Sequence, residues 1–410
     1  DSELMHRVER LLPAEDWLTR EKVGSIYMKS HFLAYPPSPF SLARVFGLAA
    51  FARMLVGYGR ARLTGLIRRP SPDTFEDDLV GRLGRELYQV LFKPIALKLW
   101  GDPRELDVEL SRGRVQTPSI SEVLGRLLKL RRTSDFEALT FRYPRGGLGR
   151  LWESIENKAR GHGRFLLGHS VSRLEIQNER VSTIHCTRAD GAPDVAFDGG
   201  RDDFVVSTLP LRLLTSLLKD YLPETIAELG ERVVALSDLV LVFLHIDKPS
   251  LLRESWIFVP DPDIVFHRVS EQESFDPGMT PNGSVVCCEI MSNDRRAMAI
   301  LSDEALAKAA RNGLAEMGYR DFAVKQHRII RLPKSYPVMR MGFQGPLCQI
   351  ITALDAIPNL RTVGRQGAFK YIGTLDAMDI GYGFARWYAG RGEHQWYEER
   401  ERTNRYPVLD

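Results

Sequence analysis

The stretch VGRQGAFKYIGTLDAMDIGYGFA, residues 363–385, contains the features that decide the fold. An apolar segment leads into it, and Gly364 and Gly367 would let the backbone approach a ligand closely. Arg365 adds a planar cation suited to phosphate two residues past the predicted strand. The pattern predicts a strand that runs into a glycine turn, and this turn is either a ligand-binding loop or only a tight connection.

A helix is predicted to follow this turn. Thr374 is the expected N-cap, and the helix is expected to begin near Leu375. Free backbone amides and the positive end of the helix dipole favour an anionic or polar ligand at such a position.

The whole stretch resembles the C-terminal flavin-binding segment of the FAD-dependent amine oxidase superfamily, in the branch of protoporphyrinogen oxidase-like proteins and UDP-galactopyranose mutases. The resemblance implies that Gly364 and Arg365 meet the FAD pyrophosphate and that amides of the following turn and helix start meet the flavin ring; the residues concerned are Thr374, Leu375 and Asp376. Tyr371 matches an aromatic residue that usually follows the Gly-Arg pair. Residues 373–376 read GTLD where many relatives carry Asn-Met-Asp, which leaves open whose amide faces the flavin.

Length and composition describe ordinary globular material. The chain has 410 residues, of which 44% are hydrophobic, and this length suggests two domains or one large composite. A formal net charge of +3 does not indicate a nucleic-acid-binding protein. The four cysteines have no CxxC spacing, so we expect no disulfide framework and a cytoplasmic location. The nine histidines form no HExxH motif, so we expect no metal site.

The first residues already have the pattern of a helix, which is expected over residues 4–18, and an alternating pair of strands is expected over residues 25–34. In the resembled family a GxGxxG unit precedes this point, and no GxGxxG followed by a helical pattern occurs here. We therefore expect that about 70 residues, including a βαβ unit, precede Asp1 in the whole protein.

Residues 41–70 are apolar and purely basic, with six arginines and no acid. Arg44 and Arg53 interrupt the apolar run too early for a membrane-spanning helix. Two interpretations remain open: a solvated helix pair that covers a substrate cavity, or a peripheral membrane contact through which a lipophilic substrate enters.

Residues 75–101 have apolar side chains at helical spacing, and Pro94 is expected to interrupt the helix. Their Arg-x-Gly-Arg-x-Leu-Tyr, Phe-x-x-Pro and Lys-x-Trp-Gly elements resemble a signature of the same family. Most of these residues are expected to be packing residues, whereas Lys98 and Trp100 are candidates for contact with substrate. A further basic helix is expected over residues 121–132.

Two more segments match pieces of the family's FAD domain. Residues 141–150, FRYPRGGLGR, match a loop near the flavin, where Gly146 and Gly147 would permit close approach, although a plain strand-to-helix turn is an equal alternative. Two alternating strands are expected over residues 165–184, and the resemblance implies that the backbone of Val171 pairs with adenine. An apolar strand is expected over residues 202–214.

Long β-rich runs over residues 233–269 and 284–291, a helix over 302–317 and a strand over 322–332 resemble the antiparallel substrate sheet of the family. The polar groups placed nearest to substrate are His267, Arg268, Tyr336 and Arg340, together with Tyr371 from the flavin segment.

The predicted fold class is α/β, with a Rossmann-like FAD-binding domain that is assembled from discontinuous pieces and carries an inserted α+β substrate domain. The expected FAD-binding pieces are residues 1–35, 141–220 and 345–395, the helical cap is 36–140, the substrate sheet is 221–344, and 396–410 form a tail.

The resemblance implies FAD as cofactor and a small-molecule substrate. The leading hypothesis is an oxidoreductase that removes a hydride from a carbon–carbon or carbon–nitrogen bond of an apolar or sugar-linked substrate. The alternatives are a redox-neutral mutase acting on a nucleotide sugar, and a non-catalytic partner subunit should the dinucleotide fold be absent. No catalytic acid or base stands out, which suits hydride transfer controlled by position.

Overall fold

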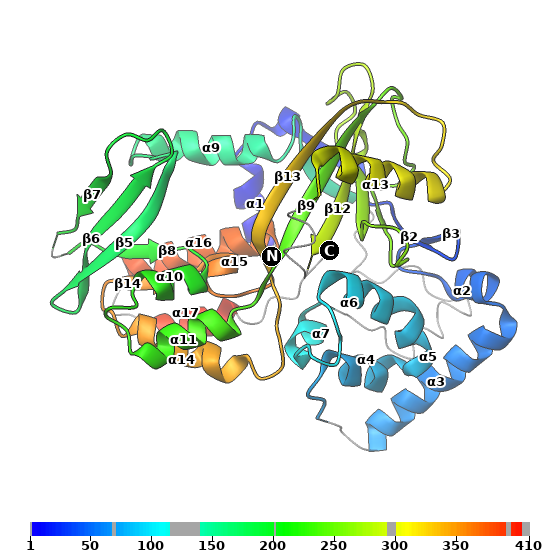
Figure 1. The fold of residues 1–410 in the computed structure, drawn as a ribbon, viewed down its shortest axis with the longest axis horizontal. Helices are drawn as coiled ribbons and strands as arrows, with labels where there is room; N and C mark the ends of the chain where they lie inside the picture. Colours follow the sequence, from blue (N-terminus) through cyan, green and yellow to red (C-terminus); the bar gives the residue numbers. More distant parts are fainter. Residues whose placement is uncertain are drawn as a thin grey trace. The chain divides into compact units, whose positions relative to one another are not determined.

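The computed structural model describes residues 2–67, 71–114, 140–200, 202–292, 301–390 and 395–403. The chain divides into two compact units (Figure 1). The first contains residues 1–108, 116–161 and 237–335, and the second contains residues 109–115, 162–236 and 336–410. The helix predicted over residues 121–132, and Arg68 and Arg69 of the basic stretch, lie outside the described residues.

A seven-stranded sheet forms the centre of the first unit, as the long β-rich runs predicted. Its order is β13 (Val324–Pro337), β9 (Leu236–Ile246), β12 (Ser284–Ser292), β11 (Arg268–Glu271), β10 (Trp256–Phe258), β2 (Gly24–Met28) and β3 (His31–Ala34). The neighbours from β9 to β10 are antiparallel, whereas β10 and β2 are parallel.

One face of this sheet carries the larger core. Alternate residues of β9 and β12 point into it, including Val242, Leu244 and Cys288, because successive strand side chains point to opposite faces. Helix α13 (Asp303–Glu316) covers this face with Leu306, Ala310 and Leu314, which lie one turn apart. The predicted helix over residues 302–317 is therefore confirmed.

The amino-terminal segment differs from its prediction. Helix α1 covers only Ser2–Glu9, a 3₁₀ turn follows at Ala14–Asp16, and β1 (Trp17–Glu21) pairs antiparallel with β4 (Thr140–Pro144). The helix expected over residues 4–18 was too long because Pro13 disfavours the helical conformation of the residue before it. The strand pair expected over residues 25–34 is present as β2 and β3.

The helical part of the first unit contains α2 (Pro39–Phe46), α3 (Leu48–Ile67), α4 (Phe75–Leu83), α5 (Arg85–Leu87), the π-helical turn η2 (Tyr88–Phe92) and α6 (Lys93–Leu99), followed by α7 (Val108–Arg114). The α-helix is interrupted before Pro94 as expected: the π-helical turn η2 ends at Phe92, and Pro94 lies in the first turn of α6, where its missing N–H costs nothing. An additional break falls at Gly84, whose φ of 81° lets the chain pass within contact of the Gly57 carbonyl.

In the second unit, β5 (His169–Gln177), β6 (Arg180–Arg188) and β7 (Val195–Asp198) form an antiparallel sheet. The predicted turn of the first hairpin is present, since Asn178 and Glu179 have φ of 50° and 60°. Helix α9 (Gly149–Arg160), which belongs to the first unit, precedes this sheet in the chain. Helices α10 (Leu211–Leu217), α11 (Glu224–Val233) and α14 (Gln344–Asp355) follow it in the chain.

A short parallel pair, β8 (Val205–Ser207) and β14 (Leu360–Thr362), leads into the glycine turn and into helices α15 (Gly364–Gly367), α16 (Thr374–Ala389) and α17 (Trp396–Thr403). The apolar strand predicted in residues 202–214 is present as β8, and helix α10 begins directly after Pro210. Part of the segment expected as a tail is helix α17, whose Trp396 packs in a core with Val363, Ile380 and Trp387.

The two units divide the chain differently from the predicted domains. Residues 1–35 were expected with the FAD-binding pieces, yet β2 forms backbone hydrogen bonds with β10 and so belongs to the larger sheet. Strand pairing between segments more than 200 residues apart is not visible in local sequence patterns.

Candidate functional site

The glycine turn after β14 is the centre of the candidate site. Gly364 has a φ of 84°, a conformation that other residues rarely adopt. Gly367 has no room for a side chain, because a methyl group there would lie 2.9 Å from both the Ser207 carbonyl oxygen and Thr362 Oγ1. The Thr362 hydroxyl donates to the Gly367 carbonyl and holds the turn against the strand. Both glycines are therefore required by the turn itself, and their role in letting the backbone approach a ligand stays a prediction.

The helix after this turn begins one residue earlier than predicted. Gly373, not Thr374, is the N-cap, and its N–H donates to Asp376 Oδ2 at 2.9 Å. A carboxylate three residues into a helix is well placed to reach back in this way. Asp376 was predicted at the flavin through its backbone, and its side chain caps α16. Leu375 is 39% exposed.

The turn places Arg365 against two neighbouring tyrosine rings. Its guanidinium carbon lies 4.2 Å from the ring centre of Tyr336 and 4.9 Å from that of Tyr371. The two rings are 5.4 Å apart, and Arg365 Nη1 donates to the Ile372 carbonyl oxygen at 3.1 Å. Cation–π contacts and one hydrogen bond thus fix the plane of the guanidinium.

The other edge of this guanidinium is buried and unsatisfied. Arg365 Nε and Nη2 have no hydrogen-bond partner among the residues that the structure describes. A buried cationic donor without a partner is costly, and Nε and Nη2 together form the edge that binds a phosphate through two parallel hydrogen bonds. Arg365 and the glycine turn therefore fit the pyrophosphate of a dinucleotide cofactor.

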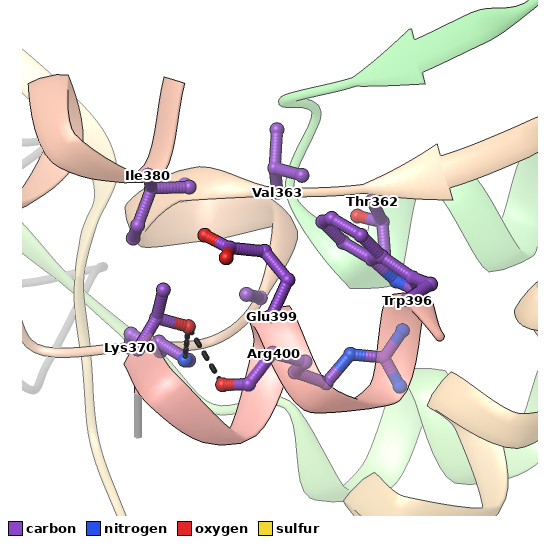
Figure 2. Close-up of a pocket in the computed structure, with 10 residues that line it drawn as sticks. Thr362, Val363, Lys370, Ile380, Trp396, Glu399 and Arg400 are labelled. Carbon is purple, nitrogen blue, oxygen red and sulfur yellow. Dashed lines mark hydrogen bonds between the residues drawn. The ribbon is translucent and has the colours of Figure 1, made fainter. Parts of the chain in front are cut away.

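A small recess lies beside the same turn (Figure 2). It is lined by Thr362, Val363, Gly364, Ala368, Lys370, Ile380, Trp396, Glu399, Arg400 and Thr403. Lys370 Nζ donates to Thr403 Oγ1 at 2.5 Å, and this hydroxyl donates to the Arg400 carbonyl oxygen at 2.8 Å. Burial, and then the nearby Arg400, lower the pKa of Lys370 to about 8. Sequence reasoning missed Lys370, although it lies within the flavin-like stretch.

The second glycine pair, in the first unit, also has a constrained backbone. Gly146 and Gly147 have φ of 80° and 98°, and both precede helix α9. The Gly146 N–H donates to Asp276 Oδ2 at 2.6 Å. The predicted turn is present, and its first amide is already bound to a carboxylate of the protein.

Arg268 and His267, predicted near substrate, lie beside a buried carboxylate. Arg268 Nε and Nη2 donate to the two oxygens of Glu289 on the neighbouring strand at 2.8 and 2.9 Å. His267 is 7% exposed, and its Nε2 is 3.8 Å from Glu289 Oε2. The bidentate pair occupies the edge of Arg268 with which it would bind an anion.

Lys98 and Trp100, predicted as candidates for contact with substrate, have structural partners. Lys98 Nζ donates to the carbonyl oxygens of Val259, Ile264 and Phe266 at 2.8, 2.7 and 2.9 Å. Burial lowers the pKa of Lys98 to about 8, so the ammonium is still protonated at pH 7 and all three of its protons are used. Trp100 is buried and packs on Phe75.

The remaining predicted residues are less informative. Val171 lies on β5 opposite Cys186, next to a β-bulge. Arg340 is exposed. The structure thus brings Gly364, Arg365, Tyr371 and Tyr336 together in the second unit, whereas Lys98, Trp100, Gly146, Gly147, His267 and Arg268 belong to the first.

The cysteines and possible metal ligands add no further site. Cys348 is exposed on α14, and the other three cysteines are buried. Within the described ranges, no group of three histidine, cysteine, aspartate or glutamate side chains could hold a metal ion. None of the described helices is both long and apolar enough to cross a membrane.

Comparison with known families defines the class of protein. Residues 75–343 match the model of the flavin-containing amine oxidoreductases, so the chain belongs to this family. It is a flavoprotein fold whose cofactor is FAD. The matched range ends before the glycine turn, and the fit of Arg365 and of this turn to a dinucleotide is an independent observation.

Solved structures with the same fold include three of different described activities. A reduced UDP-galactopyranose mutase has a TM-score of 0.77 at 17% identity, covering 98% of this chain and 82% of its own. A putative protoporphyrinogen oxidase from Exiguobacterium sp. 255-15 has a TM-score of 0.64 at 16% identity, covering 88% and 80%. A redesigned putrescine oxidase has a TM-score of 0.59 at 12% identity, covering 96% and 86%. At these identities the likeness establishes the fold alone.

Proposed function

We propose that this protein is an FAD-dependent oxidoreductase that removes a hydride from a carbon–carbon or carbon–nitrogen bond of an apolar or sugar-linked substrate. Membership of the flavin-containing amine oxidoreductases supports the reaction class. The observation that carries the proposal is the buried Nε–Nη2 edge of Arg365, which has no hydrogen-bond partner among the described residues.

The residues around the turn would bind and orient the cofactor. FAD, when bound, supplies the ring that accepts the hydride. Arg365 would donate Nε–H and Nη2–H to a pyrophosphate oxygen pair, while Nη1 stays on the Ile372 carbonyl. Gly364 lets backbone approach that phosphate without a side chain in the way. Because Tyr336 and Tyr371 hold the guanidinium plane, little side-chain freedom remains to be lost on binding.

An absorbance spectrum of the protein expressed from its full natural reading frame is the first test. The spectrum is expected to show the bands of oxidised flavin, and heating is expected to release the flavin from the protein. A folded but colourless protein would contradict the proposal and favour the non-catalytic alternative.

The variant Arg365→Met tests the residue that carries the argument. Loss of two charge-assisted hydrogen bonds is expected to weaken FAD binding at least about 100-fold. Arg386→Met is the matched control, because Arg386 is exposed on α16 and should leave FAD affinity unchanged. Flavin titration followed by fluorescence quenching measures both. Equal FAD affinity of Arg365→Met and the natural protein would refute the role of Arg365.

A redox-neutral mutase acting on a nucleotide sugar is the second candidate function. The neighbouring rings of Tyr336 and Tyr371, 5.4 Å apart, favour it, because such a mutase needs arginine and tyrosine side chains around a diphosphate, and Arg340 is the arginine that would join them. Dithionite-reduced protein should then catalyse ring contraction of a nucleotide sugar, measured by chromatography. Absence of an isomerised product with the fully reduced, flavin-loaded protein would exclude the mutase and leave the oxidoreductase.

A further inference from the structure

Helix α3 exposes a continuous apolar stripe. Leu48, Val56, Leu63 and Ile67 are 79%, 60%, 61% and 85% exposed. Ala52, Leu55 and Gly59 lie between them, and members of the stripe follow one another at intervals of three or four residues, except for the adjacent Leu55 and Val56. Residues at this spacing lie on one side of a helix. Phe40, at the start of α2, is also 79% exposed.

The opposite side of α3 already has its packing partners. Met54 and Tyr58 are 3% and 8% exposed, and α3 contacts α4 and α5 within the first unit (Figure 1). Gly57 lies against the Gly84 backbone and the Glu86 side chain. The fold of the helical region therefore uses the Met54 and Tyr58 side of the helix. Packing within this region does not use the exposed stripe, and so much apolar surface in contact with water is unfavourable.

Arginines border the stripe. Arg53 and Arg60 are exposed and lie on one flank, Arg62 lies on the other flank, and Arg44 is exposed on α2. Arg62 Nε donates to the Tyr58 hydroxyl at 3.2 Å. Residues 41–67 contain no aspartate or glutamate. Residues 41–67 thus contribute an apolar stripe with only positive charges beside it, and an acid from another helix, Glu86 of α5, lies against Gly57.

We propose that this surface, made of the α3 stripe and the arginines of α3 that border it, binds the face of a lipid bilayer that contains anionic headgroups. The apolar side chains would enter the boundary between headgroups and acyl chains, and the arginines would contact phosphates, as in helices that lie in the plane of a membrane. The inference does not depend on the proposed reaction.

Charge decides between a bilayer and a second copy of the chain. A symmetric dimer through this stripe would bring the arginines of both copies together, and residues 41–67 contain no acid to balance them. A bilayer with anionic lipids has the complementary charge and can cover a long, convex helix face.

Vesicle flotation of the flavin-loaded full chain tests the proposal. Binding is expected to vesicles of phosphatidylcholine mixed with phosphatidylglycerol, and to be at least about tenfold weaker with phosphatidylcholine alone. It should also weaken strongly at about 1 M salt, where the screening length is about 3 Å.

Two double variants separate the apolar and the ionic contributions. Val56→Gln with Leu63→Gln, and Arg53→Gln with Arg60→Gln, are each expected to reduce vesicle binding at least about tenfold. Matched controls are Leu167→Gln, an exposed apolar residue outside the stripe, and Arg328→Gln, an exposed arginine on β13. Neither control should change binding. All of these positions are solvent-exposed, and circular dichroism and bound flavin check that each variant folds.

Three outcomes would overturn the proposal. One is equal binding of the stripe variants and the natural chain. Another is no binding of the natural chain to anionic vesicles. The third is a change of molecular mass in light scattering caused by the stripe variants, without any change in vesicle binding, which would assign the surface to a contact between copies of the chain.

Discussion

Replacing Lys98 by methionine should destabilise the first unit because it removes the cation that joins three backbone carbonyls. These belong to Val259, Ile264 and Phe266, and no other side chain donates to them among the hydrogen bonds of the described residues. Methionine keeps the length and apolar stem of the side chain, so the change isolates the ammonium.

The expected loss is about 3 kcal/mol. Hydrogen bonds to a charged group contribute about 1.5–3 kcal/mol each. Against this stands the cost of burying the ammonium, which lowers its pKa from 10.5 to about 8. That shift is equivalent to about 3 kcal/mol. Three such bonds together contribute more free energy than burying the ammonium costs, and the difference is the expected loss of stability.

Hydrogen exchange gives a local measurement of this loss. The Val259 N–H donates to the His267 carbonyl oxygen at 2.8 Å across the loop that Lys98 holds. Its protection should fall about 100-fold in Lys98→Met. Lys93→Met, a change of the same residue type in the same helix, should leave that protection unchanged. Unchanged protection in Lys98→Met would refute the structural role and restore Lys98 as a candidate for substrate contact.

Two further predictions concern buried polar groups of the second unit. Because folding lowers the pKa of Lys370 from 10.5 to about 8, the unfolded chain binds more protons between these pH values, and the free energy of unfolding should rise with pH in that window. In Lys370→Met, urea unfolding at several pH values should show a flatter rise and a gain of about 1 kcal/mol at pH 7. An unchanged pH profile would contradict the assignment. Asn359 accepts from the Val181 N–H at 2.9 Å and donates to the Val181 and Asp203 carbonyls at 3.0 and 3.3 Å. Asn359→Ala should lower the free energy of unfolding by about 2–4 kcal/mol because it leaves these groups unsatisfied, whereas the control Asn157→Ala on α9 should not change it. Equal urea midpoints for the two variants would contradict this prediction.

Local patterns were sufficient for much of the chain. The glycine turn at Gly364 and Gly367 could be predicted because its requirement is a backbone conformation and a close approach, which only glycine satisfies. The β2–β3 and β5–β6 hairpins could be predicted because alternation and turn residues act over a few positions. Family membership and FAD also followed from residues that can be read in order along the chain.

Element ends and side-chain roles depended on partners distant in sequence. The additional break at Gly84 follows from contact with Gly57. Lys98 looked like a cavity residue in the sequence, yet the carbonyls that bind it come more than 160 residues later.

Arg365 shows both contributions in one residue. The sequence determined that a planar cation follows a glycine turn, which predicts a phosphate contact. Only the tertiary structure decided which edge is available, because Tyr336 approaches from a different strand and Ile372 takes Nη1. A side chain's chemistry is fixed by its type, whereas the orientation of its donors is fixed by whatever packs around it.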